Sequence, residues 1–122
     1  MPTPYRSVYM TFPDEPSAVR VAQALVLERL VACVNVVPAG FSVYRWDGAV
    51  QREAELVAFA KTRADLVPDV IRRVTELHPY DVPAVLTLPI EGGAAPYLAW
   101  LDGELPDRDA SEGSRGNEGD RR

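Results

Sequence analysis

The middle of the chain predicts one β-hairpin that is too long for a domain of this size. Asp47-Gly48 is the strongest short signal for a two-residue type I′ turn. The strand-forming residues around it extend each arm to about 15 residues, which is roughly 50 Å at ~3.3 Å per residue. A domain body of about 100 residues is only roughly 35 Å across. The arms must therefore overshoot the body or bend, and Pro38-Ala39-Gly40 marks the expected bulge or bend.

The residues on either side of the hairpin predict helices. Apolar residues recur at helical spacing over residues 16–29, directly after the helix-start sequence Asp14-Glu15-Pro16-Ser17. A second amphipathic helix is expected to follow Asp65 as its N-cap and to reach Leu77. Pro96 to Leu101 predicts a short C-terminal helix.

Two further strands complete the predicted element order. Val8 to Phe12 and Val85 to Leu88 are short apolar runs of strand-forming residues. With the two hairpin arms, from Val31 and from Val50, they give the order βαββαβ followed by a terminal helix. Two helical crossovers around a hairpin predict an α+β, ferredoxin-like sandwich: a four-stranded sheet with helices on one face.

The overshooting hairpin carries apolar side chains that a monomer would leave in water. Phe41, Val43, Tyr44 and Trp46 all lie near its turn. Large exposed apolar patches are rare on monomeric proteins and mark interaction surfaces. The sequence therefore predicts an obligate oligomer in which each hairpin pairs with or covers a neighbouring copy.

Composition excludes several classes of partner. The formal net charge is −5, which argues against nucleic acid and anionic membranes. Cys33 is the only cysteine, and no apolar stretch approaches the roughly 20 residues of a membrane span, so a cytoplasmic protein is expected. One domain is predicted over residues 1–102, and the polar residues 103–122 are expected to form a disordered tail.

Several separate motifs, in order, resemble the CutA divalent-cation-tolerance family, over roughly residues 6–102. One departure is the first loop, where Phe12-Pro13 stands and no cysteine is present. The motifs are Leu30-Val31-Ala32-Cys33-Val34-Asn35-Val36-Val37-Pro38, Ser42-Val43-Tyr44-Arg45-Trp46-Asp47-Gly48, Glu53-Ala54-Glu55, Lys61-Thr62-Arg63, His78-Pro79-Tyr80-Asp81-Val82-Pro83 and Tyr97-Leu98-Ala99-Trp100-Leu101.

The resemblance implies a fold, an assembly and a function. The family has a ferredoxin-like fold and forms homotrimers in which long hairpins wrap neighbouring subunits. Its members are linked to tolerance of copper and other divalent metals, and some bind Cu(II). The resemblance thus implies a non-catalytic protein that binds Cu(II) or another divalent metal, with no organic cofactor. It also implies a likeness to the trimeric PII signalling proteins.

Two residues are candidate metal ligands, and each has a structural alternative. His78 lies on a turn stiffened by Pro79 and Pro83, and imidazole is a natural ligand, but a histidine at a helix end is also favoured by the helix dipole. The thiolate of Cys33 suits soft metals, although a cysteine in a buried strand usually acts as a small hydrophobe.

Four further residues are carried over from the resemblance as a ligand pocket: Trp46, Glu55, Lys61 and Tyr80. In an unbent hairpin Lys61 lies roughly 40 Å from Trp46, because position i faces position 95 − i across the turn. The two side chains share a site only if they come from different subunits or if the bend is sharp. Structural roles are also open: a solvated Lys61, an interface anchor at Trp46 and a packing role for Tyr80.

Two functions compete at this point. The first is a metal-responsive, copper-binding trimer. The second is a PII-like sensor that binds a small anionic metabolite in clefts between subunits through Lys61, although no Gly-rich phosphate loop is present. An RNA-binding role is rejected on charge and on the lack of strand aromatics. An enzymatic role is disfavoured because no motif ties Ser42, Cys33 and His78 together.

Overall fold

The computed structural model describes residues 3–108 and confirms the predicted α+β order. The predicted tail falls mostly at residues 109–122, which lie outside the described residues. The helices are α1 (Glu15–Leu27), α2 (Val67–Leu77) and α3 (Ala95–Gly103), and the strands are β1 (Tyr5–Phe12), β2 (Cys33–Trp46), β3 (Ala49–Arg63) and β4 (Val85–Pro89).

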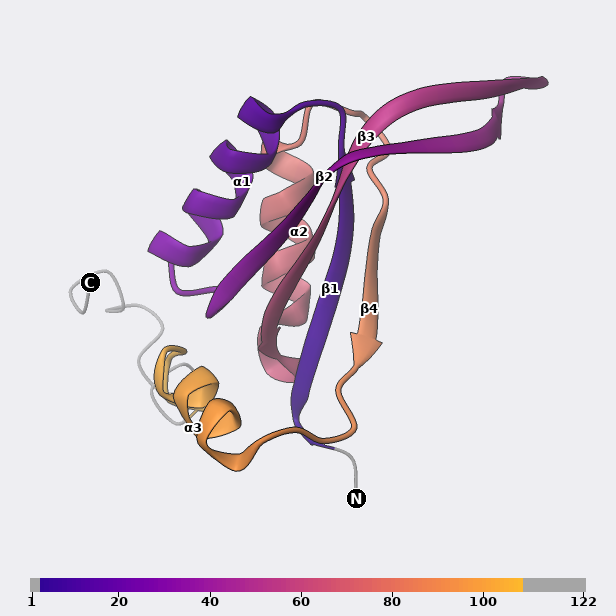
Figure 1. Ribbon diagram of the computed structural model, residues 1–122. Coiled ribbons are helices and arrows are strands. Elements are labelled where there is room, and N and C mark those ends of the chain that lie inside the picture. The colour runs from indigo at the N-terminus through magenta and orange to yellow at the C-terminus, as the bar shows by residue number, and fades with distance from the viewer. Residues whose placement is uncertain (1–2, 109–122) are drawn as a thin grey trace.

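The four strands form one antiparallel sheet in the order β2-β3-β1-β4. Both α1 and α2 cover the same face of this sheet, which is the ferredoxin-like arrangement (Figure 1). The core lies between the two layers. Its buried side chains are Val8, Met10 and Phe12 from β1, Ala58 and Ala60 from β3, Ala18, Val21 and Leu25 from α1, and Val70 and Val74 from α2, together with Val31.

The hairpin bends and projects beyond the rest of the sheet, as the sequence predicts (Figure 1). Trp46 pairs with Ala49 across the turn, and the register shifts by one residue between Val37 and Gly40. This β-bulge falls on the predicted bend, where proline removes a ladder donor. A side chain at Gly40 would press on a backbone carbonyl, because a Cβ there would lie 3.0 Å from the oxygen of Glu55.

The two long helices begin differently. Asp14 caps α1 as expected: its carboxylate accepts a hydrogen bond from the backbone N–H of Ser17 (2.9 Å). The expectation that Asp65 caps α2 is wrong. A short 3₁₀ turn, Ala64–Leu66, precedes α2, and the Asp65 carboxylate instead pairs with the guanidinium of Arg63 (2.6 Å).

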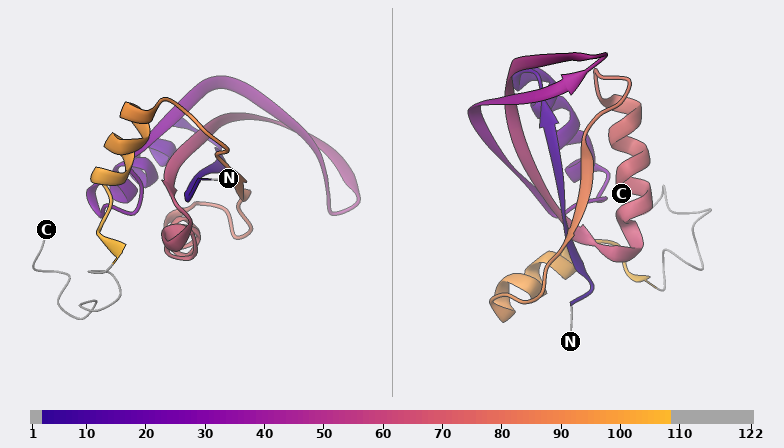
Figure 2. Two further views of the ribbon diagram at one scale, coloured as in Figure 1. Left: turned by 90° about the horizontal axis from the view of Figure 1, so that it is seen from below. Right: turned by 90° about the vertical axis from the view of Figure 1, so that its right-hand side faces the viewer.

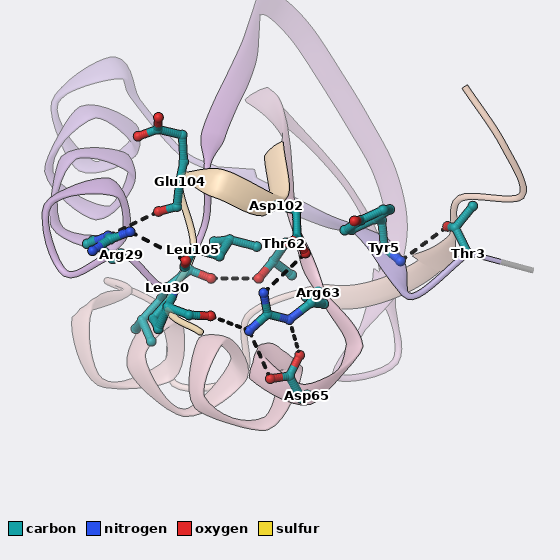
Figure 3. A network of polar contacts seen from close by, with 11 residues as sticks. Thr3, Tyr5, Arg29, Leu30, Thr62, Arg63, Asp65, Asp102, Glu104 and Leu105 are labelled. Atoms are coloured by element: carbon teal, nitrogen blue, oxygen red, sulfur yellow. Dashed lines mark hydrogen bonds and ion pairs between the residues drawn. The ribbon is translucent and has the colours of Figure 1, made fainter. Parts of the chain in front are cut away.

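Arg63 joins the end of β3 to the segment after α3 (Figure 3). Its side chain is only 2% exposed. Besides Asp65, the guanidinium contacts Asp102 (3.3 Å) and donates to the backbone oxygen of Pro106 (2.6 Å). Leu105 is also buried, so packing against the domain continues beyond residue 102.

Candidate functional site

The two long helices, α1 and α2, leave the opposite face of the sheet uncovered (Figure 2), and Val37, Leu86 and Leu88 on that face are exposed. Side chains alternate along each strand, so Val8 and Ala60 point toward the helices while their neighbours Tyr9 and Phe59 point away. We call this uncovered side the open face. Its described side chains include Cys33, Asn35, Val37, Phe59, Lys61, Tyr9, Leu86 and Leu88.

A cavity of about 620 Å³ lies where the hairpin leaves the sheet. We call it the hairpin-base cavity. A shallower hollow on the outer side of α1 is lined by none of the predicted site residues. The hairpin-base cavity is lined by Tyr9 and Thr11 of β1, Ser42, Tyr44 and Trp46 of β2, Glu55 of β3, and Pro79, Tyr80, Asp81, Val82 and Ala84 of the α2–β4 segment.

Glu55 is the buried charge of this cavity. It is 8% exposed, and its two carboxylate oxygens accept hydrogen bonds from different hydroxyl groups. Ser42 donates to one oxygen (2.6 Å) and Tyr80 to the other (3.1 Å). Within residues 3–108 no lysine, arginine or histidine forms an ion pair with Glu55. Its carboxylate is therefore satisfied in hydrogen bonds without a compensating positive charge.

Tyr80 packs on the cavity wall with its hydroxyl hydrogen-bonded, which is one of the roles that the sequence left open. Burial, together with the hydrogen bond to Glu55, raises the pKa of Tyr80 to about 12. The phenol therefore stays protonated at neutral pH and acts as a hydrogen-bond donor. Its ring lies 5.0 Å from the ring of His78, which fixes its position on the cavity wall.

His78 lies beneath Tyr80 and is buried. One ring nitrogen, Nδ1, accepts the backbone N–H of Tyr80 (3.1 Å), which leaves Nε2 to donate to the backbone oxygen of Thr11 (2.7 Å). The imidazole also stacks on Phe12, with ring centroids 4.7 Å apart. A metal would reach either nitrogen only by breaking one of these bonds. His78 as a metal ligand stays a prediction.

Cys33 and Lys61 form a separate group on the open face. They face each other across β2 and β3, and Lys61 donates to the side-chain oxygen of Asn35. The Cys33 sulfur lies 3.4 Å from the hydroxyl of Tyr97 in α3. This contact and burial raise the pKa of Tyr97. Lys61 is six residues from Glu55 along β3, which is roughly 20 Å.

The structure thus divides the predicted site residues into two groups. Trp46, Glu55 and Tyr80 line one cavity, with His78 beneath it, whereas Cys33 and Lys61 lie elsewhere on the open face. Among residues 3–108, no three His, Cys, Asp or Glu side chains lie close enough to hold a metal ion.

Sequence reasoning missed several residues of both groups. Tyr9 and Tyr97 were not among the predicted site residues, yet one lines the cavity and the other contacts Cys33. Strand alternation could have placed Ser42 and Tyr44 in the cavity lining, because both side chains lie on the same face of β2 as Trp46. No sequence signal placed Tyr9, since its position depends on the neighbouring strand.

Comparisons with known proteins agree on the family. The family model for the CutA1 divalent ion tolerance protein matches residues 6–104. The divalent-cation tolerance protein CutA of Thermus thermophilus is 48% identical over 94 residues, which cover 77% of this chain and 91% of the relative. Chloroplastic CutA of Arabidopsis thaliana is 45% identical over 94 residues, 77% of this chain, but the match spans only 52% of that relative's length.

A comparison with solved structures points to the same family. The crystal structure of CutA1 from Oryza sativa superposes with a TM-score of 0.83 at 42% identity, covering 87% of this chain and 97% of that one. Within the described residues, no helix is long and apolar enough to cross a membrane. The sequence motifs, the hairpin and the sheet order thus have one explanation: this chain belongs to the CutA1 divalent ion tolerance family.

Proposed function

We propose that the protein is a non-catalytic homotrimer that binds copper or another divalent metal and takes part in the response to such ions. Family membership supports the link to divalent ions. The position of Cys33 supports metal binding by the assembled protein. Its thiol is half-buried on the open face, at a surface that other copies would cover. The proposed setting is the cytoplasm.

Assembly is supported by uncovered apolar side chains. On the open face Leu86 is 60% exposed and Val37 52% exposed, and on the hairpin Phe41 is 60% and Trp46 58% exposed. Monomeric proteins rarely leave many large apolar side chains this exposed to water. Closed symmetric assemblies cover such surfaces by placing the same patches of several copies together.

The free edges of the hairpin support the same assembly. β1 pairs with β3 only from Leu56 to Arg63, so the segment of β3 from Ala49 to Glu55 has β2 as its single partner. Unpaired strand edges are templates for strand addition by another chain. The projecting hairpin is therefore suited to pair with a neighbouring copy.

Metal binding in this proposal depends on assembly. A single chain supplies no group of three ligands among residues 3–108, whereas a three-fold assembly brings symmetric copies of open-face residues together. Cys33 would supply a thiolate to such a site, which suits copper and zinc. His78 would take part only after losing its bond to Thr11 or Tyr80.

A non-catalytic role is supported by how the chain uses its one histidine. Both ring nitrogens of His78 serve structural hydrogen bonds, and the partner of the Cys33 thiol is Tyr97 rather than an imidazole. A nucleophile activated by an adjacent base requires a contact that these two residues do not make with each other.

Metal titration of the assembled protein tests the proposal. Calorimetry with Cu(II), and with Zn(II) as a redox-inert ion, is expected to show saturable binding that Cys33→Ser weakens by at least tenfold. Glu53→Gln is the control, since it removes an exposed carboxylate elsewhere and should leave the affinity unchanged. Unchanged affinity in Cys33→Ser, with the oligomer intact, would overturn Cys33 as a ligand.

A further inference from the structure

The hairpin-base cavity has a charge and a lining that the proposed metal site does not use. We infer that this cavity binds a small organic ammonium ion, which its aromatic side chains surround and the carboxylate of Glu55 attracts. The inference goes beyond the proposed function and rests on contacts within one chain. Its residues lie apart from Cys33.

The charge of the cavity favours a cation. Glu55 is 8% exposed, and both of its hydrogen-bond donors, Ser42 and Tyr80, are neutral hydroxyl groups. Asp81 adds a second carboxylate to the lining, and the described lining contains no lysine, arginine or histidine. A carboxylate this buried is destabilising unless an opposite charge accompanies it. A cationic occupant would supply that charge, whereas an anionic metabolite would be repelled.

The walls of the cavity favour an organic cation. Four lining residues are aromatic, namely Tyr9, Tyr44, Trp46 and Tyr80. The faces of such rings attract alkylammonium groups, and sets of aromatic side chains are how proteins recognise quaternary ammonium ligands. The volume of about 620 Å³ falls within the ordinary range for small-molecule sites.

Two of the aromatic walls are already fixed in place. The hydroxyl of Tyr80 is bound to Glu55 and its ring lies 5.0 Å from that of His78. Tyr9 packs edge-on against Phe59, with ring centroids 5.8 Å apart. Side chains ordered before binding cost less entropy when the ligand arrives. The structural role of His78 thus includes support for one wall of this site.

A divalent metal fits the cavity less well. Hard cations take six or more oxygen ligands, or keep several waters, whereas the lining offers two carboxylates, the hydroxyl groups of Thr11 and Ser42 and a wall of aromatic rings, and the Ser42 hydroxyl is already bound to Glu55. An organic ammonium ion is weakly hydrated and loses little on entering such a site. The two cation classes are therefore assigned to different places on the molecule.

A pair of isosteres tests the charge requirement. Trp100→Phe leaves Trp46 as the only tryptophan, so its fluorescence reports on the cavity alone. Choline is expected to change this emission in a saturable way. Its neutral isostere, 3,3-dimethyl-1-butanol, should bind at least tenfold more weakly. Equal affinity for choline and 3,3-dimethyl-1-butanol would overturn the inference. So would the absence of any fluorescence response to choline at millimolar concentration, which is the result expected if a side chain of another copy fills the cavity.

Two carboxylate variants localise the effect. Glu55→Gln keeps the shape of the side chain and is expected to weaken choline binding at least tenfold, while Glu91→Gln, an exposed carboxylate outside the lining, should stay within twofold. Equal losses in both variants would indicate general electrostatics and contradict the site. If Glu55→Gln does not fold, Tyr44→Leu takes its place, with several-fold weaker binding expected in calorimetry and unchanged binding counted against the inference.

The same proteins separate this inference from the metal proposal. Cys33→Ser should bind choline normally, and Glu55→Gln should keep its Cu(II) affinity. If either variant lost the binding of both choline and Cu(II), the two sites would not be independent. Failure of Cu(II) binding alone would leave the ammonium site standing, and failure of choline binding alone would leave the metal proposal standing.

Discussion

At the scale of single residues, buried polar groups hold the site together. His78 connects its own turn, through Tyr80, to the end of β1, through Thr11 and Phe12. Glu55 connects β2 and the α2–β4 segment through two hydroxyl groups. In the described part of the chain no buried side-chain nitrogen or oxygen lacks a hydrogen-bond partner. Each of these residues therefore costs more to remove than an exposed polar group would.

Replacing His78 tests its structural role. His78→Ala leaves the oxygen of Thr11 and the N–H of Tyr80 without their partners and opens space beside Phe12. We expect the free energy of unfolding to fall by about 2–4 kcal/mol, measured by chemical denaturation. His78→Gln, whose amide both donates and accepts, should lose less. Wild-type stability in His78→Ala would contradict this role.

The pair formed by Asp65 and Arg63 predicts a dependence of stability on pH. Burial alone would raise the pKa of Asp65, but the hydrogen bond and charge of Arg63 outweigh it and hold that pKa below its ordinary 3.8. A carboxyl group with a lowered folded pKa stabilises above the unfolded pKa, and the contribution is lost as the pH falls through the folded value.

The matching experiment compares wild type with Asp65→Asn. Urea denaturation at pH 7 should show the wild type to be more stable. As the pH falls below 3.8 and through the lowered folded pKa of Asp65, the difference between the two proteins should shrink, because the Asp65 carboxyl becomes protonated. A difference that is constant across this range would show that the charge of Asp65 does not contribute.

Residue roles were only partly predictable from the sequence. The stiff turn after His78 and the shared face of Ser42 and Tyr44 follow from proline geometry and strand alternation. The contact between Tyr80 and Glu55 joins segments 25 residues apart. It depends on how far β4 and the bent hairpin approach each other, and no local pattern contains that information.

At the scale of elements, the hairpin is the feature that the sequence predicts most fully. Its turn places Asp47 at φ 52° and Gly48 at φ 81°, as a type I′ turn requires. The register and the bulge follow from this turn and from Pro38. By contrast, the start of α2 was mispredicted because the Asp65 carboxylate had two possible partners, the helix N-terminus and the guanidinium of Arg63. It pairs with Arg63, whose side chain is buried and held by Asp102 and Pro106, and these two contacts are distant in sequence.

Gly48→Ala tests the turn directly. A Cβ at Gly48 meets no atom within 4 Å, so any loss comes from the positive φ alone. We expect destabilisation of about 1 kcal/mol in thermal or chemical denaturation. Gly103→Ala is the matched control, because a Cβ there is equally free and φ is not positive. Equal effects in both variants would contradict strain at the turn.

At the scale of the whole molecule, the exposed surfaces of the chain support the proposed assembly. Within residues 3–108 the apolar side chains of Leu86, Phe41 and Trp46 are exposed, and the outer part of β3 has β2 as its single pairing strand. The sequence predicts an obligate oligomer from the hairpin length together with the apolar residues near the turn. The number of copies, three, is part of the proposal, because the fold of a single subunit does not specify its symmetry.

The mass of the protein in solution tests this account most directly. Light scattering on a size-exclusion column should give three times the chain mass of 13.4 kDa, unchanged on tenfold dilution. A matched pair of variants, Leu86→Glu on the open face and Thr87→Glu on the opposite side of β4, should lose and keep the trimer respectively. A wild-type protein of 13.4 kDa, a monomer, would contradict the assembly and with it the metal site that depends on it.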